Sequence, residues 1–105
     1  MIVVTTETIE GKKIAETLGL VNGNVIRAKH IGKDIAAVLR HVVGGEIKEY
    51  TEMMNDSRDI AFKRMIKDAE GLDADAIVGV RFTTSMVMAG ASEILAYGTA
   101  VKLER

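Results

Sequence analysis

The chain has 105 residues, with 14 basic and 15 acidic side chains and a net charge near −1. This length fits a single domain covering residues 1–105, and the near-neutral charge argues against general nucleic-acid binding, which requires a broad positive field. No cysteine is present, which excludes disulfides, thiolate nucleophiles and cysteine-based zinc or iron–sulfur sites. Hydrophobic residues make up 48% of the chain, enough to form a core rather than a disordered segment.

The N-terminal sequence indicates a cytoplasmic protein. It reads Met-Ile-Val-Val-Thr-Thr-Glu, without the positive segment and the long apolar stretch of a secretory signal. No uncharged apolar run approaches the length of about 18 residues that suggests a membrane-spanning helix. We therefore expect a cytoplasmic location and no membrane partner.

Extended structure is predicted in the N-terminal third. The β-branched residues of Ile2–Thr5 favour a short strand. Residues 13–29 are ambiguous, because their apolar spacing suits a helix, whereas Gly19 and Gly23 would each cost about 1 kcal/mol inside one. The last part of this segment, 25–29, reads as a strand. We favour extended structure with a bend at Asn22-Gly23.

Two helices are predicted next. The first runs from Asp34, a good N-cap, to Val43, and Gly44-Gly45 ends it. The second runs from Glu46 to Leu72 and has an apolar stripe opposite a charged face. The stripe consists of Ile47, Tyr50, Met54, Ala61, Met65, Ala69 and Leu72.

Two strands separated by a loop complete the chain. The first is Ala76–Phe82, with Ala76, Val78, Val80 and Phe82 on one face. The second is Glu93–Leu103, whose large residues (Leu95, Tyr97, Val101, Leu103) and small residues (Ala96, Gly98, Ala100) alternate. Together with Gly79, the small residues would let a helix pack unusually close to the sheet. We expect the loop Thr84–Ser92 to be mobile around Ala89–Ser92.

The order of these elements predicts an α+β fold. A mostly antiparallel sheet would carry one short and one long helix on one face.

Oxygen and nitrogen side chains are the candidate metal ligands. Four carboxylates on one face of the long helix could bind a hard divalent cation, or they could form a solvated face that includes an ion pair between Asp59 and Lys63. The chain has two imidazoles, which would join such a site only if the fold brings them together. The candidate ligands are His30, His41, Glu49, Glu52 and Asp56, and the cofactor that they suggest is a divalent metal ion.

The methionines allow two interpretations. Met53-Met54, Met86 and Met88 could supply thioether ligands to Cu(I), but methionine more often fills gaps in a core or between subunits, which is the favoured interpretation. The chain lacks the Gly-x-Ser-x-Gly, P-loop and Gly-x-Gly-x-x-Gly motifs. We therefore predict no catalytic residues and no enzymatic activity.

Two charged residues lie within or beside the apolar stripe of the long helix, namely Arg58 and Asp68. A buried charge needs a partner, so we expect a salt bridge or hydrogen bonds at a subunit contact. A small organic ligand held between subunits near Tyr50, Arg58 and Tyr97 is the alternative interpretation.

Several segments together resemble the YbjQ family, which is also labelled as a heavy-metal-binding domain family. They are Gly44-Gly45-Glu46, Tyr50, Arg58-Asp59-Ile60-Ala61, Ala74-Asp75-Ala76-Ile77-Val78-Gly79 and Tyr97-Gly98-Thr99-Ala100-Val101. The resemblance covers essentially the whole chain. It implies a dodecin-like α+β subunit in a homopentameric ring, strands through residues 13–29, and metal binding. The short domain and its aliphatic stripes also favour burial by self-association.

Overall fold

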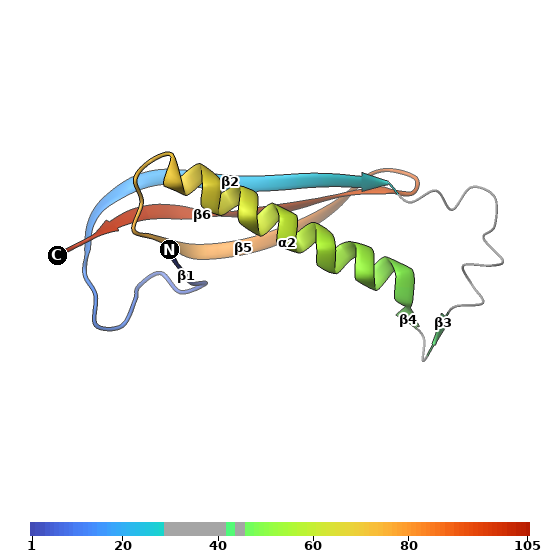
Figure 1. Ribbon diagram of the computed structural model, residues 1–105, viewed down its shortest axis with the longest axis horizontal. Helices are drawn as coiled ribbons and strands as arrows, with labels where there is room; N and C mark the ends of the chain where they lie inside the picture. The colour runs from blue at the N-terminus through green and yellow to red at the C-terminus, as the bar shows by residue number, and fades with distance from the viewer. Residues whose placement is uncertain (29–41, 44–45) are drawn as a thin grey trace.

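The computed structural model describes residues 1–28, 42–43 and 46–105. Within them, a four-stranded sheet of order β1-β5-β6-β2 carries one helix, α2, on one face (Figure 1). The predicted α+β class is therefore confirmed. The elements are β1 (Ile2–Val3), β2 (Ile14–Ala28), β3 (Val42–Val43), β4 (Glu46–Ile47), α2 (Lys48–Glu70), β5 (Ala76–Met88) and β6 (Ala91–Leu103).

The sheet is mostly antiparallel, as predicted. β6 pairs antiparallel with β2 on one side and with β5 on the other, whereas β1 pairs parallel with β5. The contact of β1 is short, because only Ile2 and Val3 are paired, opposite Ala76 and Ile77. Backbone hydrogen bonds between the N-terminal segment and β5 extend to Val80 in the described residues. The N–H of Val80 donates to the carbonyl of Val4 at 3.1 Å.

The helix boundaries differ from the prediction. Residues 34–41 of the predicted short helix, and Gly44-Gly45, lie outside the described residues. Val42 and Val43 form β3, which pairs with β4, so the predicted helical end at Val43 is wrong, and the long helix begins at Lys48 rather than at Glu46. Valine and isoleucine are β-branched residue types, which favour extended backbone.

β2 confirms the extended prediction but not the bend at Asn22-Gly23. Its pairing with β6 runs unbroken through this point, with Asn22 opposite Tyr97 and Gly23 opposite Ala96. The glycine serves another purpose: a Cβ at position 23 would lie 2.3 Å from the carbonyl oxygen of Ala61 and 2.3 Å from the amide nitrogen of Met65. Only a residue without a side chain lets the backbone of α2 come this close to the strand.

The core lies between the C-terminal half of α2 and the sheet. Ala61, Met65 and Ala69 are fully buried, as the predicted stripe requires, but Leu72 follows the helix and is 44% exposed. The sequence interpretation missed Ser57, which is buried and donates its hydroxyl to the carbonyl of Met53 at 2.7 Å. The facing core residues of the sheet are Val21, Val25, Ile77, Val80, Ile94, Ala96 and Ala100.

Ala96 and Ala100, two of the small residues predicted to let the helix pack close to the sheet, are buried in this core. Gly98 is different, because a Cβ there would meet the side chains of Ile77 and Val80 on β5 rather than the helix. The glycine that contacts the helix backbone is Gly23.

A bulge in β5 overturns the predicted face of this strand. Gly79 has a φ of 63°, and the register with β6 shifts between Val78 and Arg81. Val78 therefore packs on the face away from α2, whereas Val80 belongs to the core under α2. The extra residue of a bulge reverses the alternation.

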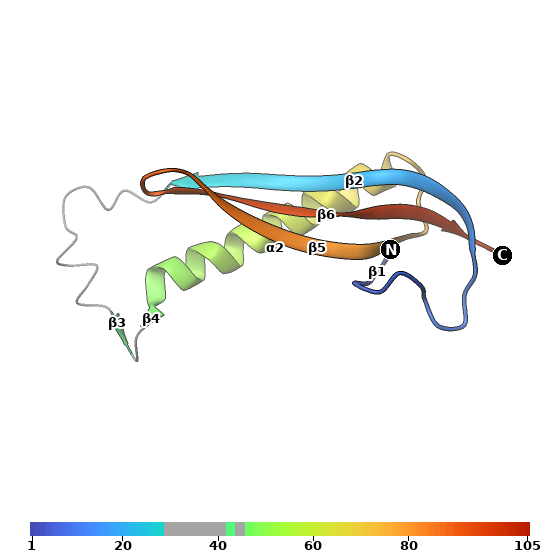
Figure 2. The same ribbon diagram turned by 180° about the vertical axis from the view of Figure 1, so that it is seen from behind.

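The predicted loop Thr84–Ser92 is wrong as well. β5 continues to Met88 and β6 starts at Ala91, so that the connection is a tight turn at Ala89 and Gly90. In both views, the N-terminal half of α2 diverges from the sheet (Figure 2). The hairpin of β5 and β6 extends in a different direction, to its turn. Among the described residues, no helix therefore covers the far end of the sheet.

Candidate functional site

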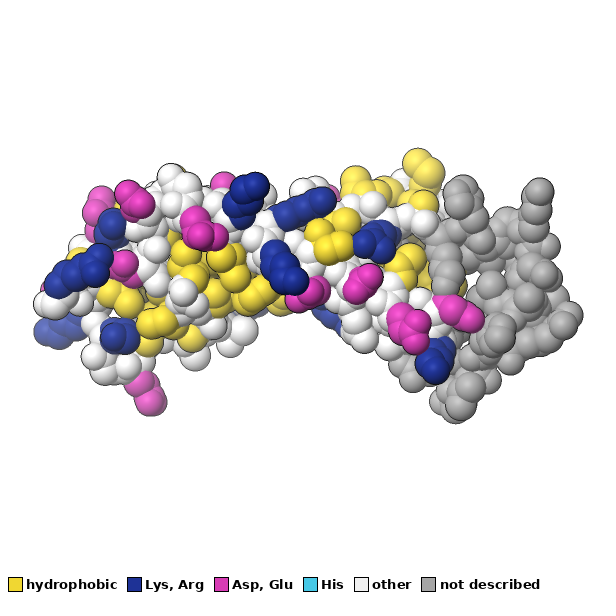
Figure 3. Space-filling view, viewed as in Figure 1, with side chains coloured by type: hydrophobic (Ala, Val, Ile, Leu, Met, Phe, Trp, Pro, Cys, Tyr) yellow, Lys and Arg dark blue, Asp and Glu magenta, His cyan; other side chains and the backbone are white. Residues whose placement is uncertain are grey.

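The second half of β5, residues Arg81–Met88, is exposed along its whole length; we call it distal β5. Its apolar side chains are accessible to an unusual degree: Phe82 45%, Met86 77%, Val87 47% and Met88 67%. One edge of distal β5 pairs with β6, and within the described part of the chain no strand pairs with the other edge. Hydrophobic side chains accordingly gather at the turn end of the sheet (Figure 3).

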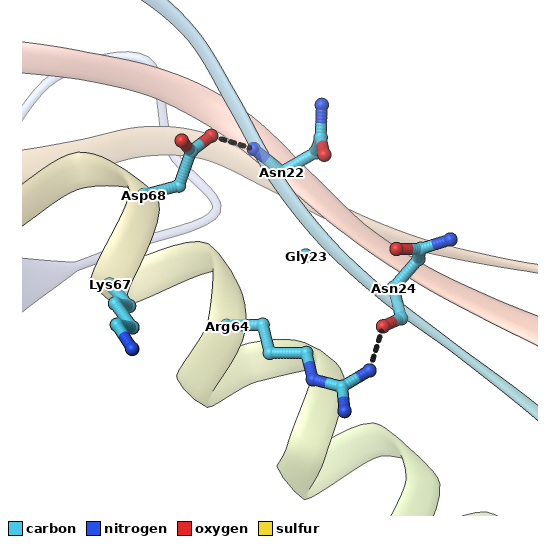
Figure 4. A pocket seen from close by; sticks show the side chains of 6 residues that line it. All are labelled: Asn22, Gly23, Asn24, Arg64, Lys67 and Asp68. Atoms are coloured by element: carbon cyan, nitrogen blue, oxygen red, sulfur yellow. Dashed lines mark hydrogen bonds between the residues drawn. The ribbon is translucent and has the colours of Figure 1, made fainter. Parts of the chain in front are cut away.

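A groove of about 420 Å³ lies between α2 and β2, the strand at the opposite edge of the sheet. The Asp68 carboxylate accepts the backbone N–H of Asn22 at 3.0 Å, and the Arg64 guanidinium donates to the carbonyl of Asn24 at 2.7 Å (Figure 4). The groove is lined by Asn22, Gly23, Asn24, Arg64, Lys67 and Asp68. Helix side chains thus contact the edge of this strand.

A second cavity, of about 440 Å³, lies on the sheet face away from α2. Val78 and Val101 give it a buried apolar floor. The Arg81 guanidinium is held at this cavity by two bonds of 2.8 Å, to the carbonyls of Thr5 and Val80. The lining residues are Glu7, Ile14, Thr17, Val78, Gly79, Arg81, Thr99 and Val101. An apolar floor with a few fixed polar groups is typical of sites for small organic molecules.

The described residues do not assemble a metal site. Glu49, Glu52 and Asp56 all lie on α2, and no group of three or more His, Cys, Asp or Glu side chains in the described ranges is placed to hold a metal ion. The ion pair of the alternative interpretation is confirmed, with Asp59 and Lys63 3.0 Å apart. His30 and His41 lie outside the described residues, so metal binding through them stays a prediction.

The structure does not bring the predicted contact residues together within one subunit. Arg58 is exposed and bonds to Asn55 on its own helix. Tyr50 is half-buried on α2, whereas Tyr97 lies on the face away from α2, because its neighbour Ala96 is buried beneath the helix. Asp68 finds a partner in its own chain, at Asn22. Roles at a subunit contact stay predictions.

The methionines divide into two groups. Met65 is fully buried and Met54 packs against the core, as the gap-filling interpretation expects. Met86 and Met88 are mostly exposed, so that they do not fill the core of their own subunit.

One carboxylate has a perturbed titration. The N–H of Leu103 donates to the Asp75 carboxylate at 2.9 Å and lowers the pKa of Asp75. The charges of Arg105 and Lys102 lower it further, and desolvation opposes both effects. Asp75 thereby ties the end of β6 to the start of β5.

Sequence reasoning missed Arg64 and the role of Gly23. The available signal was the pattern Val21, Gly23, Val25, in which a glycine occupies a position that faces the core. A glycine at such a position indicates a close backbone approach.

Comparisons with known proteins agree on one family. The model of the YbjQ family, described as "Putative heavy-metal-binding", matches residues 1–104. A UPF0145 protein of Archaeoglobus fulgidus is 62% identical over 103 residues, covering 98% of this chain and 95% of its own length. Corresponding proteins of Vibrio campbellii and Thermotoga petrophila are 61% and 58% identical, covering 98% and 100% of this chain and 99% of each relative.

A solved structure has the same fold. It is a protein of unknown function from Pediococcus pentosaceus, assigned to the DUF74 family, with a TM-score of 0.68 and 19% identity over 99% of this chain and 98% of that one. In the described ranges, no helix has the length and apolar character needed to cross a bilayer. On the strength of the family match and the high identities, this chain belongs to the YbjQ family, also named UPF0145, whose members found here carry no established function.

Proposed function

We propose that this protein is a non-enzymatic subunit of a homo-oligomeric ring, and that distal β5 is one of the surfaces through which its copies meet. The observation that carries the proposal is the exposure of every residue of distal β5, half of which are apolar. A long apolar strand with an unpaired edge associates with other chains unless it is covered. A second copy of the chain is the partner that is always present to cover it.

A second apolar surface supports a head-to-tail arrangement. Leu20 and Ile26 are 70% and 58% exposed, and they point away from α2 because the alternate residues Val21 and Val25 are buried beneath it. Two different apolar surfaces on one chain suit a heterologous contact, which closes into a ring when its rotation allows. The pentameric number and the dodecin-like subunit come from the family resemblance alone, and the cytoplasmic location stays a prediction from the sequence.

Native mass spectrometry tests the proposal. We expect the wild-type protein to have the mass of a pentamer, and the double variant Met86→Asp/Met88→Asp to dissociate to monomers, because unpaired carboxylates are costly to bury in a contact. Leu72→Asp is the control, since Leu72 is a similarly exposed apolar residue at the end of α2. A monomeric wild type, or a double variant that keeps the wild-type mass, would contradict the proposal.

Binding of a small organic molecule is a second candidate function. It is favoured by the cavity beside Arg81, where the guanidinium is already held in place by two carbonyls and therefore loses little freedom on binding an anionic group. We expect mass spectrometry of protein denatured after gentle purification to release a small acidic molecule. Thr99→Leu, which adds bulk to the cavity lining, should abolish its recovery; a protein that releases nothing would argue against this function.

A further inference from the structure

The edge of β2 is shaped to accept another strand. β2 is the last strand of the sheet on its side, and the backbone groups of Asn22 and Asn24 that point away from β6 face the groove beside α2 (Figure 4). Such an edge, with N–H and C=O groups in a row, is a template for the addition of a strand from another chain.

Two helix side chains occupy this edge. Asp68 accepts from the N–H of Asn22 at 3.0 Å, and Arg64 donates to the carbonyl of Asn24 at 2.7 Å. The N–H of Asn22 therefore meets an acceptor, and the C=O of Asn24, two residues later, meets a donor. A neighbouring strand would supply the same two kinds of partner. Both bonds involve a charged group and are stronger than neutral backbone bonds.

The local sequence makes this arrangement possible. Arg64 and Asp68 are four residues apart on α2, so they lie on the same side of the helix. Gly23 lets the helix backbone rest directly on β2, since any Cβ there would approach Ala61 and Met65 within 2.3 Å. The close approach brings both side chains within reach of the strand edge.

We infer that the edge of β2 is a strand-pairing surface for a second copy of this chain, and that Asp68 and Arg64 hold it closed. The two edges of the sheet then differ: distal β5 is open, whereas β2 is blocked at Asn22 and Asn24 by side chains of its own helix. This inference rests on the proposed function for the identity of the partner strand, which is distal β5 of another copy. Removing the two side chains would let the edge of β2 compete for distal β5 of another copy with the contact that closes the ring, so that open assemblies would grow beyond the normal size.

The double variant Asp68→Ala/Arg64→Ala tests this inference by light scattering and native mass spectrometry over a range of concentrations. We expect at least a twofold rise in average mass relative to wild type, increasing with concentration. Lys67→Ala is the matched control, because Lys67 lines the same groove but, among the described residues, forms no hydrogen bond with β2 of the kind that Asp68 and Arg64 form. It should keep the wild-type mass. Asp68→Asn, which keeps an oxygen acceptor for Asn22, should also keep it.

Two further results make the outcome decisive. If the double variant fails to fold by circular dichroism, the single variants Asp68→Ala and Arg64→Ala are measured instead, and each should show a smaller rise in mass. Folded variants that keep the wild-type mass at every concentration would overturn the inference. The wild-type mass separately reports on the proposed function: a monomeric wild type would contradict the ring, while growth of the variant above that monomer would still support a closed edge.

Discussion

The two halves of β5 belong to one continuous strand, yet they have opposite environments. From Ala76 to Val80 the residues are buried or half-buried, whereas from Arg81 to Met88 all are exposed. Both halves pair with β6, and both contain large apolar side chains. The difference is therefore not in hydrophobicity, although among the described residues the N-terminal segment pairs only with the first half.

What separates the halves is the layer that packs on each face. The first half lies under α2 on one side and beside the N-terminal segment on the other, where Ile2, Val4 and Ile9 pack against Ala76, Val78 and Val101. In the described residues, no corresponding layer covers distal β5. Within the described residues, the two layers of this domain therefore cover only part of the long strand.

Gly23→Ala should have the largest effect on stability, because it disrupts the contact between α2 and β2 that holds the helix over the sheet. The new Cβ would meet backbone atoms of α2 at 2.3 Å, and backbone cannot move aside as a side chain can. We expect the helix to lift from the sheet, with a loss of about 3 kcal/mol or more in the free energy of unfolding. Urea denaturation measures this loss.

Asn24→Ala is the control for that variant. It removes a side chain that bonds to Glu93 at 3.0 Å, but it leaves the helix contact at Gly23 intact, and its cost should stay near 1 kcal/mol. Equal effects of the two substitutions would mean that the close approach of α2 has no special importance.

The pair Ile77→Ala and Val87→Ala compares the two halves directly. Ile77 is fully buried, so its truncation should cost about 2–5 kcal/mol. Val87 is 47% exposed, and in an isolated subunit its truncation should change the free energy of unfolding by no more than about 0.5 kcal/mol. Denaturation at low and high protein concentration separates the cases, since a larger cost of Val87→Ala in the assembled state alone would identify it as an interface residue.

The pH dependence of stability tests the contact that Asp75 makes just before the buried half of β5. The fold lowers the pKa of Asp75 below its ordinary value of 3.8, so the stabilisation is fully present above that value and is lost as the pH falls through the lower folded pKa. Asp75→Asn should therefore be less stable than wild type at pH 7, with the difference narrowing in acid. Urea midpoints at pH 7 and pH 3 test this, and a difference that does not depend on pH would assign Asp75 a purely neutral hydrogen-bonding role.

Asp59→Ala should have the smallest effect. Its ion pair with Lys63 joins two side chains that are 62% and 73% exposed, where water and salt screen the attraction. We expect a loss of no more than about 0.5 kcal/mol, which 0.5 M salt should reduce further. A substantially larger loss would show that this face of α2 is covered by a partner.

The prediction of the candidate surfaces from sequence was partial, for identifiable reasons. Exposure of Met86 and Met88 could not be read from their chemistry, because methionine is equally suited to a core and to a subunit contact. The groove was signalled only by Asp68 at the border of the apolar stripe. Arg64 looked like an ordinary surface cation, since nothing local indicates that a strand edge lies opposite.

The sequence by itself determined the properties that depend on local pattern. Composition excluded cysteine chemistry, helical periodicity placed Ala61, Met65 and Ala69 in the core, and alternation placed Ala96 and Ala100 on one face of a strand. The motifs also pointed to the family that the comparisons show. The placements of the helix and strand residues succeeded because each rests on the repeat of a single element.

Only the tertiary structure decided the features that depend on two segments meeting. The bulge at Gly79 placed Val78 and Val80 on opposite faces of the sheet. Gly23, which resembled a turn signal, is the point where the backbone of α2 packs against β2. The predicted loop is part of a hairpin. Glycine has the same identity in a turn, a bulge and a close contact, so its role is set by what packs against it. For the same reason, the open edge of β5 and the closed edge of β2 emerge only once the sheet is assembled.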